Sequence, residues 1–416
     1  MDNPVRNAIV RGMEQKSDIL IVGGGLNGPA TALALARAGL SVTVIDAMPD
    51  GVQAEEGFDG RAYALALASV RLLRRIGVWD RVADDSQPML EIKVTDGRAG
   101  ERPSPFLMHF DHAEIEEGPM GHMIEDRFLR RALNDAMAEA DGVTVLRGRK
   151  VVDQMVQPDA AVVTLDDGRQ VPGALLIGCD GRQSGTAQRA GIRRVGWGYD
   201  QTALVCAIRH EQPHHGVAHQ FFLPQGPLAI LPLPGRRSSI VWSETSARAA
   251  AINALPEAEY LDVLRPRFGR FLGDISLAGQ RFAYPLGLSL AQFFVADRLA
   301  LVGDAAHGMH PIAGQGLNAG LRDIGALAQV LGEARVRGED IGAINVLERY
   351  QEWRRFDTAT LAMATDVSNR LFSNDNPLVR VARDLGMGAI NALPGLRRRF
   401  IREAAGLTGD LPELMR

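Results

Sequence analysis

Residues 303–323 carry the groups in this sequence that are best suited to binding chemistry. A Gly-Asp pair ends a short apolar stretch, and a glycine-rich turn then leads into a helical pattern. Backbone N–H groups at the start of a helix attract negative charge, and Asp304 is suited to accept hydrogen bonds from hydroxyl groups. Pro311 stiffens the turn, while Gly314 and Gly316 let the backbone approach a ring closely. The run predicts a site for a ligand that has hydroxyl groups and an anionic edge.

A second pattern lies almost three hundred residues earlier. The apolar residues 19–22 run directly into a turn that carries Gly23, Gly25 and Gly28, and a helical pattern and a second apolar strand that ends at Asp46 follow. Gly-x-Gly-x-x-Gly in this strand–turn–helix–strand context predicts a dinucleotide-binding fold, in which the glycines receive the pyrophosphate and Asp46 the adenosine ribose. The pattern alone does not separate FAD from NAD.

A third element lies between these two. Residues 174–181 form a predicted strand that ends in Asp180 and a glycine, and the chain has no second Gly-x-Gly-x-x-Gly. In this order the three elements resemble those of the single-component aromatic flavoprotein hydroxylases, the group that includes para-hydroxybenzoate hydroxylase. Residues 310–323 are similar to the signature of the ubiquinone-biosynthesis flavin hydroxylase family. Further matching segments extend the resemblance over roughly 17–375, and they lie at 59–61, 222–227, 231–233, 240–242 and 284–286.

The resemblance implies a role for each matching position. FAD would be the cofactor. Its contacts would be Gly23, Gly25 and Gly28 on the pyrophosphate, Asp46 on the ribose, Arg61 near the phosphates, Asp304 on the ribityl chain, and Gly316, Leu317 and Asn318 near the flavin pyrimidine. Arg127 would be a further contact of FAD, and Asp180 would contact both FAD and incoming nicotinamide dinucleotide. The loop residues Pro311, Gly314 and Gln315 would position the oxygen-bearing face of the flavin during catalysis. The sequence identifies no particular side chain as a general base, and we expect no metal.

The chemistry that the resemblance implies belongs mostly to the flavin. NAD(P)H would reduce FAD, O2 would form a C4a-hydroperoxide, and the distal oxygen would attack the aromatic ring of a polyprenyl phenol in ubiquinone biosynthesis. The strand residues Phe221, Phe222, Leu228, Ile230 and Leu231 are candidates for an apolar channel, but sheet core is the more frequent use of such residues.

Two other functions stay open at this point. A hydroxylase of a small soluble phenol would need charged residues in its pocket, for which Arg209 and Arg236 are the candidates. A flavoprotein subunit without catalysis, acting in a complex of biosynthetic enzymes, is the second alternative. Substrate-dependent NAD(P)H consumption with oxygen insertion distinguishes it from the two enzymes.

The fold class predicted from these patterns is α/β. We expect a Rossmann-like FAD-binding domain made from 17–90, 120–195 and 275–345, an inserted antiparallel β-sheet substrate domain made from 91–119 and 196–274, and C-terminal helices over 346–416. In the inserted region, strands are predicted at 202–209, 219–223, 228–231 and 238–244.

Composition limits the function classes. The chain has 416 residues, 46% of them hydrophobic, so that more than one domain is expected, and its net charge of -4 gives no support to nucleic-acid binding. Two cysteines, Cys179 and Cys206, exclude a disulfide framework. The first eighteen residues have no apolar core of a signal peptide, and no apolar stretch is long enough to span a membrane. We expect a cytoplasmic protein, in solution or on the inner face of the cytoplasmic membrane.

Two further clusters need an interpretation. The C-terminal arginines, Arg380, Arg383, 397–399 and Arg402, alternate with apolar residues, which is typical of a basic amphipathic helix that contacts a membrane, a partner enzyme or the protein body. The histidines at 210, 214, 215 and 219 have helical spacing, but the proline and glycine among them predict a hairpin turn rather than a metal-binding helix. His307 is expected to hydrogen-bond beside the cofactor.

Overall fold

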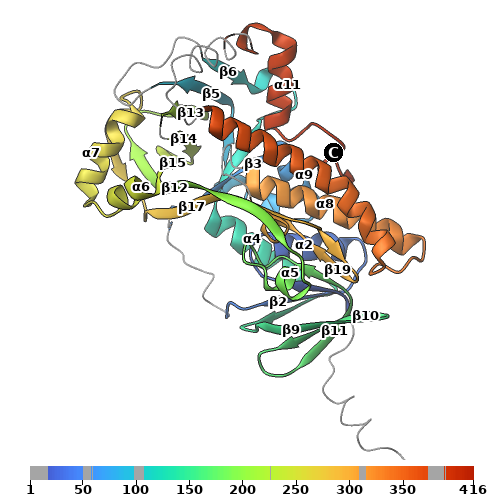
Figure 1. Cartoon of the computed structure of the whole chain (residues 1–416). Coiled ribbons are helices and arrows are strands. Elements are labelled where there is room, and N and C mark those ends of the chain that lie inside the picture. The colour runs from blue at the N-terminus through green and yellow to red at the C-terminus, as the bar shows by residue number, and fades with distance from the viewer. Residues whose placement is uncertain are drawn as a thin grey trace, which may run out of the picture.

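The computed structural model describes residues 17–49, 58, 60–97, 107–224, 226–308, 315–372, 388 and 390–416. These residues form three β-sheets with helices packed around them (Figure 1). The first sheet lies at one end of the molecule and the second sheet at the other, and the long helices α8 (Gln315–Val336) and α9 (Ile344–Phe372) run alongside (Figure 1).

The first sheet is built around β1 (Ser17–Val22). Its residues 19–22 are buried, as expected for a central parallel strand covered on both faces. Parallel partners lie on each side, and antiparallel strands complete the sheet. The remaining members are β2 (Val42–Asp46), β8 (Val143–Arg147), β9 (Val151–Gln157), β10 (Ala160–Leu165), β11 (Gln170–Gly178), β18 (Val295–Ala296) and β19 (Leu299–Leu301). Helix α2 (Asn27–Arg37) packs against α8 and against α4 (Asp126–Glu139).

Parallel pairing brings four distant segments to one edge of this sheet. The order β19-β11-β1-β2 is parallel throughout, so the carboxyl ends of these strands lie together. Gly23 follows β1, Asp46 ends β2, Asp180 follows β11 and Asp304 follows β19. Ligands of open α/β sheets bind at this carboxyl edge. The predicted cofactor residues from all three sequence elements therefore meet in space.

The second sheet has nine strands and is largely antiparallel. Its members are β5 (Glu91–Asp96), β6 (Met108–Asp111), β12 (Arg194–His210), β13 (Val217–Leu223), β14 (Gly226–Leu233), β15 (Arg237–Thr245), β16 (Ile275–Leu277), β17 (Phe282–Ala291) and β20 (His307–Gly308). Side chains alternate between its two faces. Leu204, Cys206 and Ile240 pack outward in a cluster that includes Tyr260 of α7 (Glu257–Phe268), beside α6 (Ser246–Asn253), whereas Ala207 packs inward.

A small third sheet connects the two larger ones. It consists of β3 (Ala62–Ala66), β7 (Gly121–Glu125) and β4 (Gln87–Met89). Met89 and Met123 of this sheet pack against Ala207, Ala218 and Leu233 on the inner face of the second sheet. Shorter helices surround it and the other sheets: α3 (Leu67–Arg75), α5 (Gly185–Arg189), and the 3-10 helices Trp79–Arg81, Ala83–Asp85, His112–Glu114, Gly303–Ala305 and Glu413–Met415.

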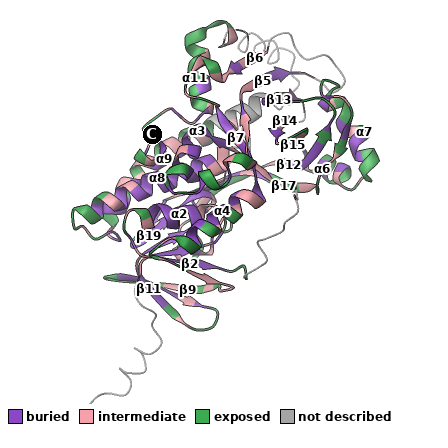
Figure 2. Ribbon diagram, turned by 180° about the vertical axis from the view of Figure 1, so that it is seen from behind, coloured by how far each residue is buried: buried purple, intermediate pink, exposed green. Residues whose placement is uncertain are grey.

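The C-terminal region contains α9 and α11 (Pro394–Ala404). Helix α9 packs against α8 and also contacts β14, whereas α11 packs on β6 at the edge of the second sheet (Figure 1). Much of α11 is exposed, in contrast to β11 of the first sheet, most of whose residues are buried (Figure 2). Arg380 and Arg383 lie outside the described residues.

The predicted fold class is confirmed, and each predicted strand of the inserted region is present with longer bounds. The hairpin predicted for the histidine segment is wrong. Residues 211–216 connect β12 to β13, and these strands are separated by β15 and β14, so the segment crosses over two strands. The domain division stays a prediction, although β16 and β17, which we expected in the cofactor domain, pair with β12 in the second sheet.

Candidate functional site

The turn after β1 has the geometry that each of its glycines predicts. Gly23 has φ of +109°, and a Cβ there would lie 2.5 Å from the carbonyl oxygen of Cys179. A Cβ on Gly28 would lie 1.9 Å from the carbonyl oxygen of Gly23, so the third glycine allows α2 to pack closely on the turn. In contrast, a Cβ on Gly25 would meet no atom within 4 Å. The second glycine therefore faces open space, where a pyrophosphate would approach the backbone at the start of α2.

Asp46 lies beside this turn, at the end of β2. Its carboxylate is buried, and Oδ1 accepts a hydrogen bond of 3.2 Å from the backbone N–H of Met48. Arg147 approaches Oδ2 to 3.9 Å. A Cβ on Gly24 would lie 2.2 Å from Oδ2, which shows how closely the carboxylate adjoins the glycine turn. This position suits a carboxylate that receives ribose hydroxyls.

Asp304 lies in the 3-10 turn that follows β19. Its side chain is 43% exposed, and Arg182 Nε lies 3.7 Å from Oδ2. Arg194, at the start of β12, donates to the carbonyl oxygens of Asp304 and Ala305 and, at 2.8 Å, to Oγ of Ser289. Arg194 therefore ties the turn to the second sheet. The sequence contains no local signal for this role, because its partners lie about a hundred residues away.

The first turn of α8 is oriented by the side chain of Asn318. Its Oδ1 accepts from the backbone N–H of Ala66 at 2.9 Å and from Oγ of Ser69 at 2.8 Å, and its Nδ2 donates to the carbonyl oxygen of Ala64 at 2.9 Å. The side chain thus fixes the first turn of α8 to protein, and the start of a helix is a position that favours an anionic ligand edge. Gln315, Gly316 and Leu317 form the same turn, whereas Pro311 and Gly314 lie outside the described residues.

A buried network of charged side chains connects the 3-10 turn Gly303–Ala305 to α8 and α9. Asp323 on α8 is fully buried, and its Oδ2 accepts from the backbone N–H of Gly303 at 3.0 Å and lies 2.5 Å from Nε2 of His307. Arg354 on α9, 2% exposed, donates from Nε to Asp323 Oδ1 at 2.9 Å. Burial alone would raise the pKa of Asp323, but the contacts with His307 and Arg354 hold it below its usual value. The carboxylate therefore fixes the 3-10 turn relative to α8.

The expected hydrogen-bonding role of His307 is thus confirmed, whereas sequence reasoning missed the network as a whole. Asp323 closes the glycine-rich run in the sequence, and that position was its only local signal.

Asp180 has local partners. Oδ1 accepts from the Ser184 hydroxyl at 2.5 Å, and Oδ2 accepts from the Thr186 backbone N–H and hydroxyl at 2.9 Å each. These bonds hold the carboxylate at the N-terminus of α5. Its predicted contact with FAD and nicotinamide dinucleotide stays a prediction.

Arg61 and Arg127 lie at the junction of β7 and α4. Arg127 Nε donates to Glu125 Oε2 at 2.8 Å, and Arg61 lies 3.6 Å from Asp126. Arg130 donates two hydrogen bonds to Asp126, and despite burial these hold the pKa of that carboxyl below its usual value. The strand β3 connects Arg61 to the backbone groups that Asn318 binds. The structure therefore places Arg61 directly before β3 and Arg127 in the first turn of α4, and the contacts of both arginines with FAD stay predictions.

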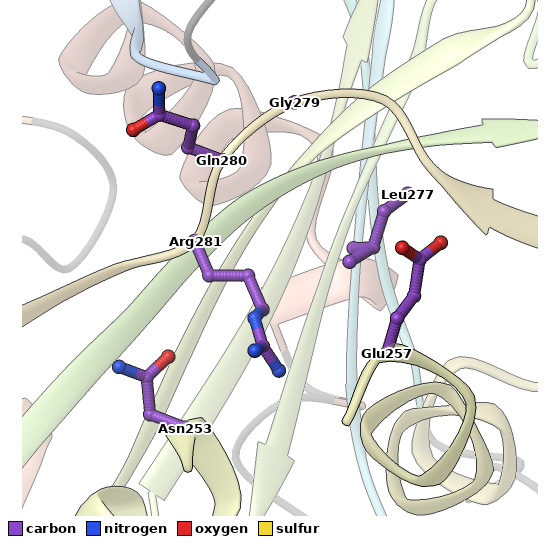
Figure 3. Close-up of a pocket in the computed structure, with 6 residues that line it drawn as sticks. All are labelled: Asn253, Glu257, Leu277, Gly279, Gln280 and Arg281. Atoms are coloured by element: carbon purple, nitrogen blue, oxygen red, sulfur yellow. The ribbon is translucent and has the colours of Figure 1, made fainter. Parts of the chain in front are cut away.

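A separate pocket lies on the outer side of the second sheet. It is lined by Asn253, Glu257, Leu277, Gly279, Gln280 and Arg281, between α6, α7 and the connection from β16 to β17 (Figure 3). The guanidinium of Arg281 donates to the carbonyl oxygen of Leu255 at 2.9 Å and lies over the Tyr260 ring. None of the predicted cofactor residues lines this pocket, so we assign it no part in the site.

The residues at the carboxyl edge of the first sheet fit FAD. A cradle at Gly25 has room for a pyrophosphate, Asp46 and Asp304 offer carboxylates for hydroxyl groups, and the first turn of α8 offers N–H donors. A reduced flavin carries negative charge at its pyrimidine end, which such a helix N-terminus stabilises. The arrangement can therefore hold a dinucleotide with a redox-active ring at α8.

Comparisons with known proteins agree with this geometry. The sequence family described as the FAD binding domain matches residues 16–364. The chain is 45% identical to the ubiquinone hydroxylase UbiL of Rhodospirillum rubrum, over all of this chain and 96% of the relative. It is 35% identical to the 3-demethoxyubiquinol 3-hydroxylase of Escherichia coli, over 94% of this chain and 99% of the relative.

A solved structure supports the fold. The p-nitrophenol 4-monooxygenase PnpA of Pseudomonas putida superimposes with a TM-score of 0.78 over 95% of this chain and 99% of that one, at 20% identity. The same assignment follows from the matched family, from the two relatives, and from the position of the three sequence elements at one edge of the first sheet. The chain belongs to the ubiquinone-biosynthesis family of FAD-dependent hydroxylases.

Proposed function

We propose that this protein is an FAD-dependent monooxygenase that hydroxylates the aromatic ring of a polyprenyl phenol in ubiquinone biosynthesis, with O2 as oxidant and NAD(P)H as transient reductant. Relatives named for ubiquinone hydroxylation support the pathway. The observation that carries the substrate class is the composition of the inner face of the second sheet. Bound FAD would supply the redox chemistry, and the chain would bind, orient and shield the substrate.

The inner face carries a cross-strand row of half-buried apolar side chains. Val205 pairs with Val241, and Val241 pairs with Ala229. All three are half-buried, whereas their neighbours on the same face, Ala207 and Ser239, are buried. Ala207 packs against the small sheet. Small apolar side chains in this row suit a prenyl chain or an aromatic ring.

The five residues predicted as candidates for an apolar channel lie on both faces of the second sheet, because side chains alternate along each strand. Leu228 and Ile230 face outward into the cluster beneath α6 and α7, with Phe221 packed against it, so these three are core residues of the outer face. Phe222 and Leu231 belong to clusters on the inner face. Only these two remain candidates for substrate contact.

A small carboxylated phenol receives less support. Arg209 and Arg236, the cations considered for such a pocket, are both exposed, and Arg236 lies in the turn between β14 and β15. Neither belongs to the half-buried row. A soluble phenol would have to bind its carboxylate elsewhere.

The function is tested with the purified holoenzyme and with cells that lack the gene. We expect NAD(P)H oxidation to rise with a short-chain prenyl phenol, the label of 18O2 to enter its ring, and 4-hydroxybenzoate to give neither effect. Deletion should remove ubiquinone and accumulate a prenylated ring that lacks one oxygen, detected by mass spectrometry of the quinone lipids. Unchanged ubiquinone in a strain without a redundant hydroxylase would refute the proposal.

We also propose that α11 contacts an anionic lipid surface. The described residues contain no helix that is long and apolar enough to cross a membrane. Arg397 and Arg402 bind Glu114 and Glu117, at 2.8 and 2.6 Å, and these pairs hold α11 on β6 and its following turn. The other two arginines of α11 are exposed.

The exposed side of α11 combines charge with apolar groups. Arg398 and Arg399 lie beside Leu393 and Leu396, which are 55 and 38% exposed. Phe400 is 41% exposed, although its ring stacks on that of Phe110 in β6. This composition is typical of interfacial helices. A lipid contact through α11 would lie next to the second sheet, whose inner face we propose as the substrate site.

Vesicle co-sedimentation tests the lipid contact. We expect the holoenzyme to bind vesicles that contain phosphatidylglycerol, and R398E/R399E to lose that binding. R335E/R337E makes the same change of net charge at the end of α8 and should bind as the wild type does. If R398E/R399E and R335E/R337E bound the anionic vesicles equally well, the proposal that α11 contacts lipid would be refuted.

A further inference from the structure

Asn27 lies where three segments of the candidate cofactor site meet. It begins α2, directly after the glycine turn, and its carboxamide lies between the 3-10 turn and α8. A Cβ on Gly303 would lie 2.1 Å from Asn27 Nδ2, and a Cβ on Gly320 would lie 2.7 Å from Oδ1. The two glycines, on different segments, therefore leave the room that this amide occupies.

The carboxamide oxygen of Asn27 has no partner. Oδ1 is fully buried, and none of the described residues donates a hydrogen bond to it. A buried polar atom without a hydrogen bond destabilises the protein, because the atom has lost its bonds to water. The backbone around it is well ordered by hydrogen bonds, since the Thr31 hydroxyl donates to the Asn27 carbonyl oxygen at 2.6 Å. An unpartnered acceptor in this position indicates that a ligand supplies the donor.

The location of Asn27 indicates which part of FAD would donate a hydrogen bond to its Oδ1. The glycine turn at Gly25 is the expected pyrophosphate site, and the first turn of α8 is the expected site of the flavin ring. Asn27 lies between them, beside the turn that carries Asp304. In FAD the ribityl chain connects pyrophosphate and ring, and its hydroxyl groups both donate and accept hydrogen bonds.

We propose that Asn27 is a cofactor-binding residue, whose Oδ1 accepts a hydrogen bond from a ribityl hydroxyl of FAD. The assignment rests on FAD binding and is independent of the substrate. Asp304 and Asn27 then hold the ribityl chain from two different segments, the 3-10 turn and α2. Binding of FAD satisfies the buried oxygen, so the energy lost in the cofactor-free chain is recovered on binding.

FAD affinity of the full-length protein tests the proposal. The variant N27L has nearly the same side-chain shape but no acceptor, and N27A serves as a second variant. We expect FAD to bind both about tenfold more weakly, as measured by flavin fluorescence on titration of the apoprotein, which corresponds to one hydrogen bond. The thermal stability of the N27L apoprotein should equal or exceed that of the wild type, because a buried unpartnered oxygen is removed.

An FAD analogue with hydrogen in place of the ribityl hydroxyls identifies the partner group. Wild type and N27L should bind this analogue equally. The matched control is T358V, since Thr358 Oγ1 is also buried and unpartnered among the described residues but lies on α9; its FAD affinity should be that of the wild type. Unchanged FAD affinity in N27L, a difference that persists with the analogue, or a less stable N27L apoprotein would each overturn the assignment.

Discussion

The buried carboxylate of Asp323 provides the sharpest test of how the site is held together. The substitution Asp323→Asn keeps the side-chain shape and removes the charge. Arg354 is then left 2% exposed, with Asp357, 27% exposed, as its remaining carboxylate at 2.8 Å. Removing one partner of a buried ion pair costs about 3–5 kcal/mol because the other charge stays buried. We expect D323N to lose stability in that range.

Thermal unfolding of the holoenzyme measures the loss. At about 2–4 °C per kcal/mol, the melting temperature should fall by roughly 10 °C. The matched control is D340N: Asp340 is 48% exposed, and Arg298 keeps the carbonyl oxygens of Pro158 and Ala174 as acceptors. A pair with one exposed partner contributes about 1 kcal/mol or less, so D340N should melt within a few degrees of the wild type.

A double-mutant cycle shows whether the two buried charges act together. R354M should destabilise for the corresponding reason, because Asp323 stays buried next to His307 with one donor fewer. We expect D323N/R354M to lose clearly less than the sum of the single losses, with a coupling of about 1–3 kcal/mol. Additive losses, or a D323N variant as stable as D340N, would refute the reasoning.

The pH dependence follows from the direction of the Asp323 pKa. That pKa is lower in the folded than in the unfolded protein, so ionised Asp323 stabilises the fold above its unfolded pKa of about 3.9. The stabilisation is lost as the pH falls through the folded pKa. The difference in stability between wild type and D323N should therefore be full near pH 7 and shrink below about pH 4.

Three further predictions concern single groups. Gly25→Ala should leave the apoprotein as stable as the wild type, because the added Cβ meets no protein atom, but it should abolish FAD binding. Gly28→Ala should prevent folding, because its Cβ would lie 1.9 Å from a carbonyl oxygen. Circular dichroism measures folding, and flavin retention measures FAD binding. Burial, with a smaller effect of Lys93, lowers the pKa of His219 to about 4, so between pH 6.5 and 4 the unfolded state binds a proton that the folded state does not. The free energy of unfolding should therefore fall by up to about 3 kcal/mol as the pH is lowered from 6.5 to 4. Thermal melts should show this loss in the wild type and not in His219→Phe. Burial raises the pKa of Cys179 to about 12 and that of Cys206 to about 11, so neither thiol should react with Ellman's reagent at pH 8 until the protein unfolds.

The sequence predicts those parts of the site whose geometry depends on neighbouring residues. The glycine turn requires Gly23 at positive φ and Gly28 against a carbonyl oxygen, and both requirements lie within one short segment. The meeting of Asp46 and Asp304 was also predictable, because parallel strands end at the same edge. The individual contacts of the predicted cofactor residues with FAD stay predictions.

Other features depend on which distant segments pack together. Arg194 binds carbonyl oxygens about a hundred residues further along the chain, and Asp323 finds Arg354 on a different helix. Arg397 and Arg402 appeared in the sequence as part of one basic face, but Glu114 and Glu117 neutralise them in the fold. Such pairings follow from tertiary packing, which local sequence patterns do not encode.

The order of strands in the first sheet has a consequence for synthesis of the chain. The sheet places β19 next to β11, which in turn pairs with β1, so the cofactor edge is incomplete until Asp304 and Asn318 have been made, almost three hundred residues after Gly23. At about 5–20 residues per second, the ribosome needs roughly 15–60 s for that interval. During this interval β11 has no β19 to pair with. During that interval the groups of the 3-10 turn and of α8 cannot contribute to FAD binding.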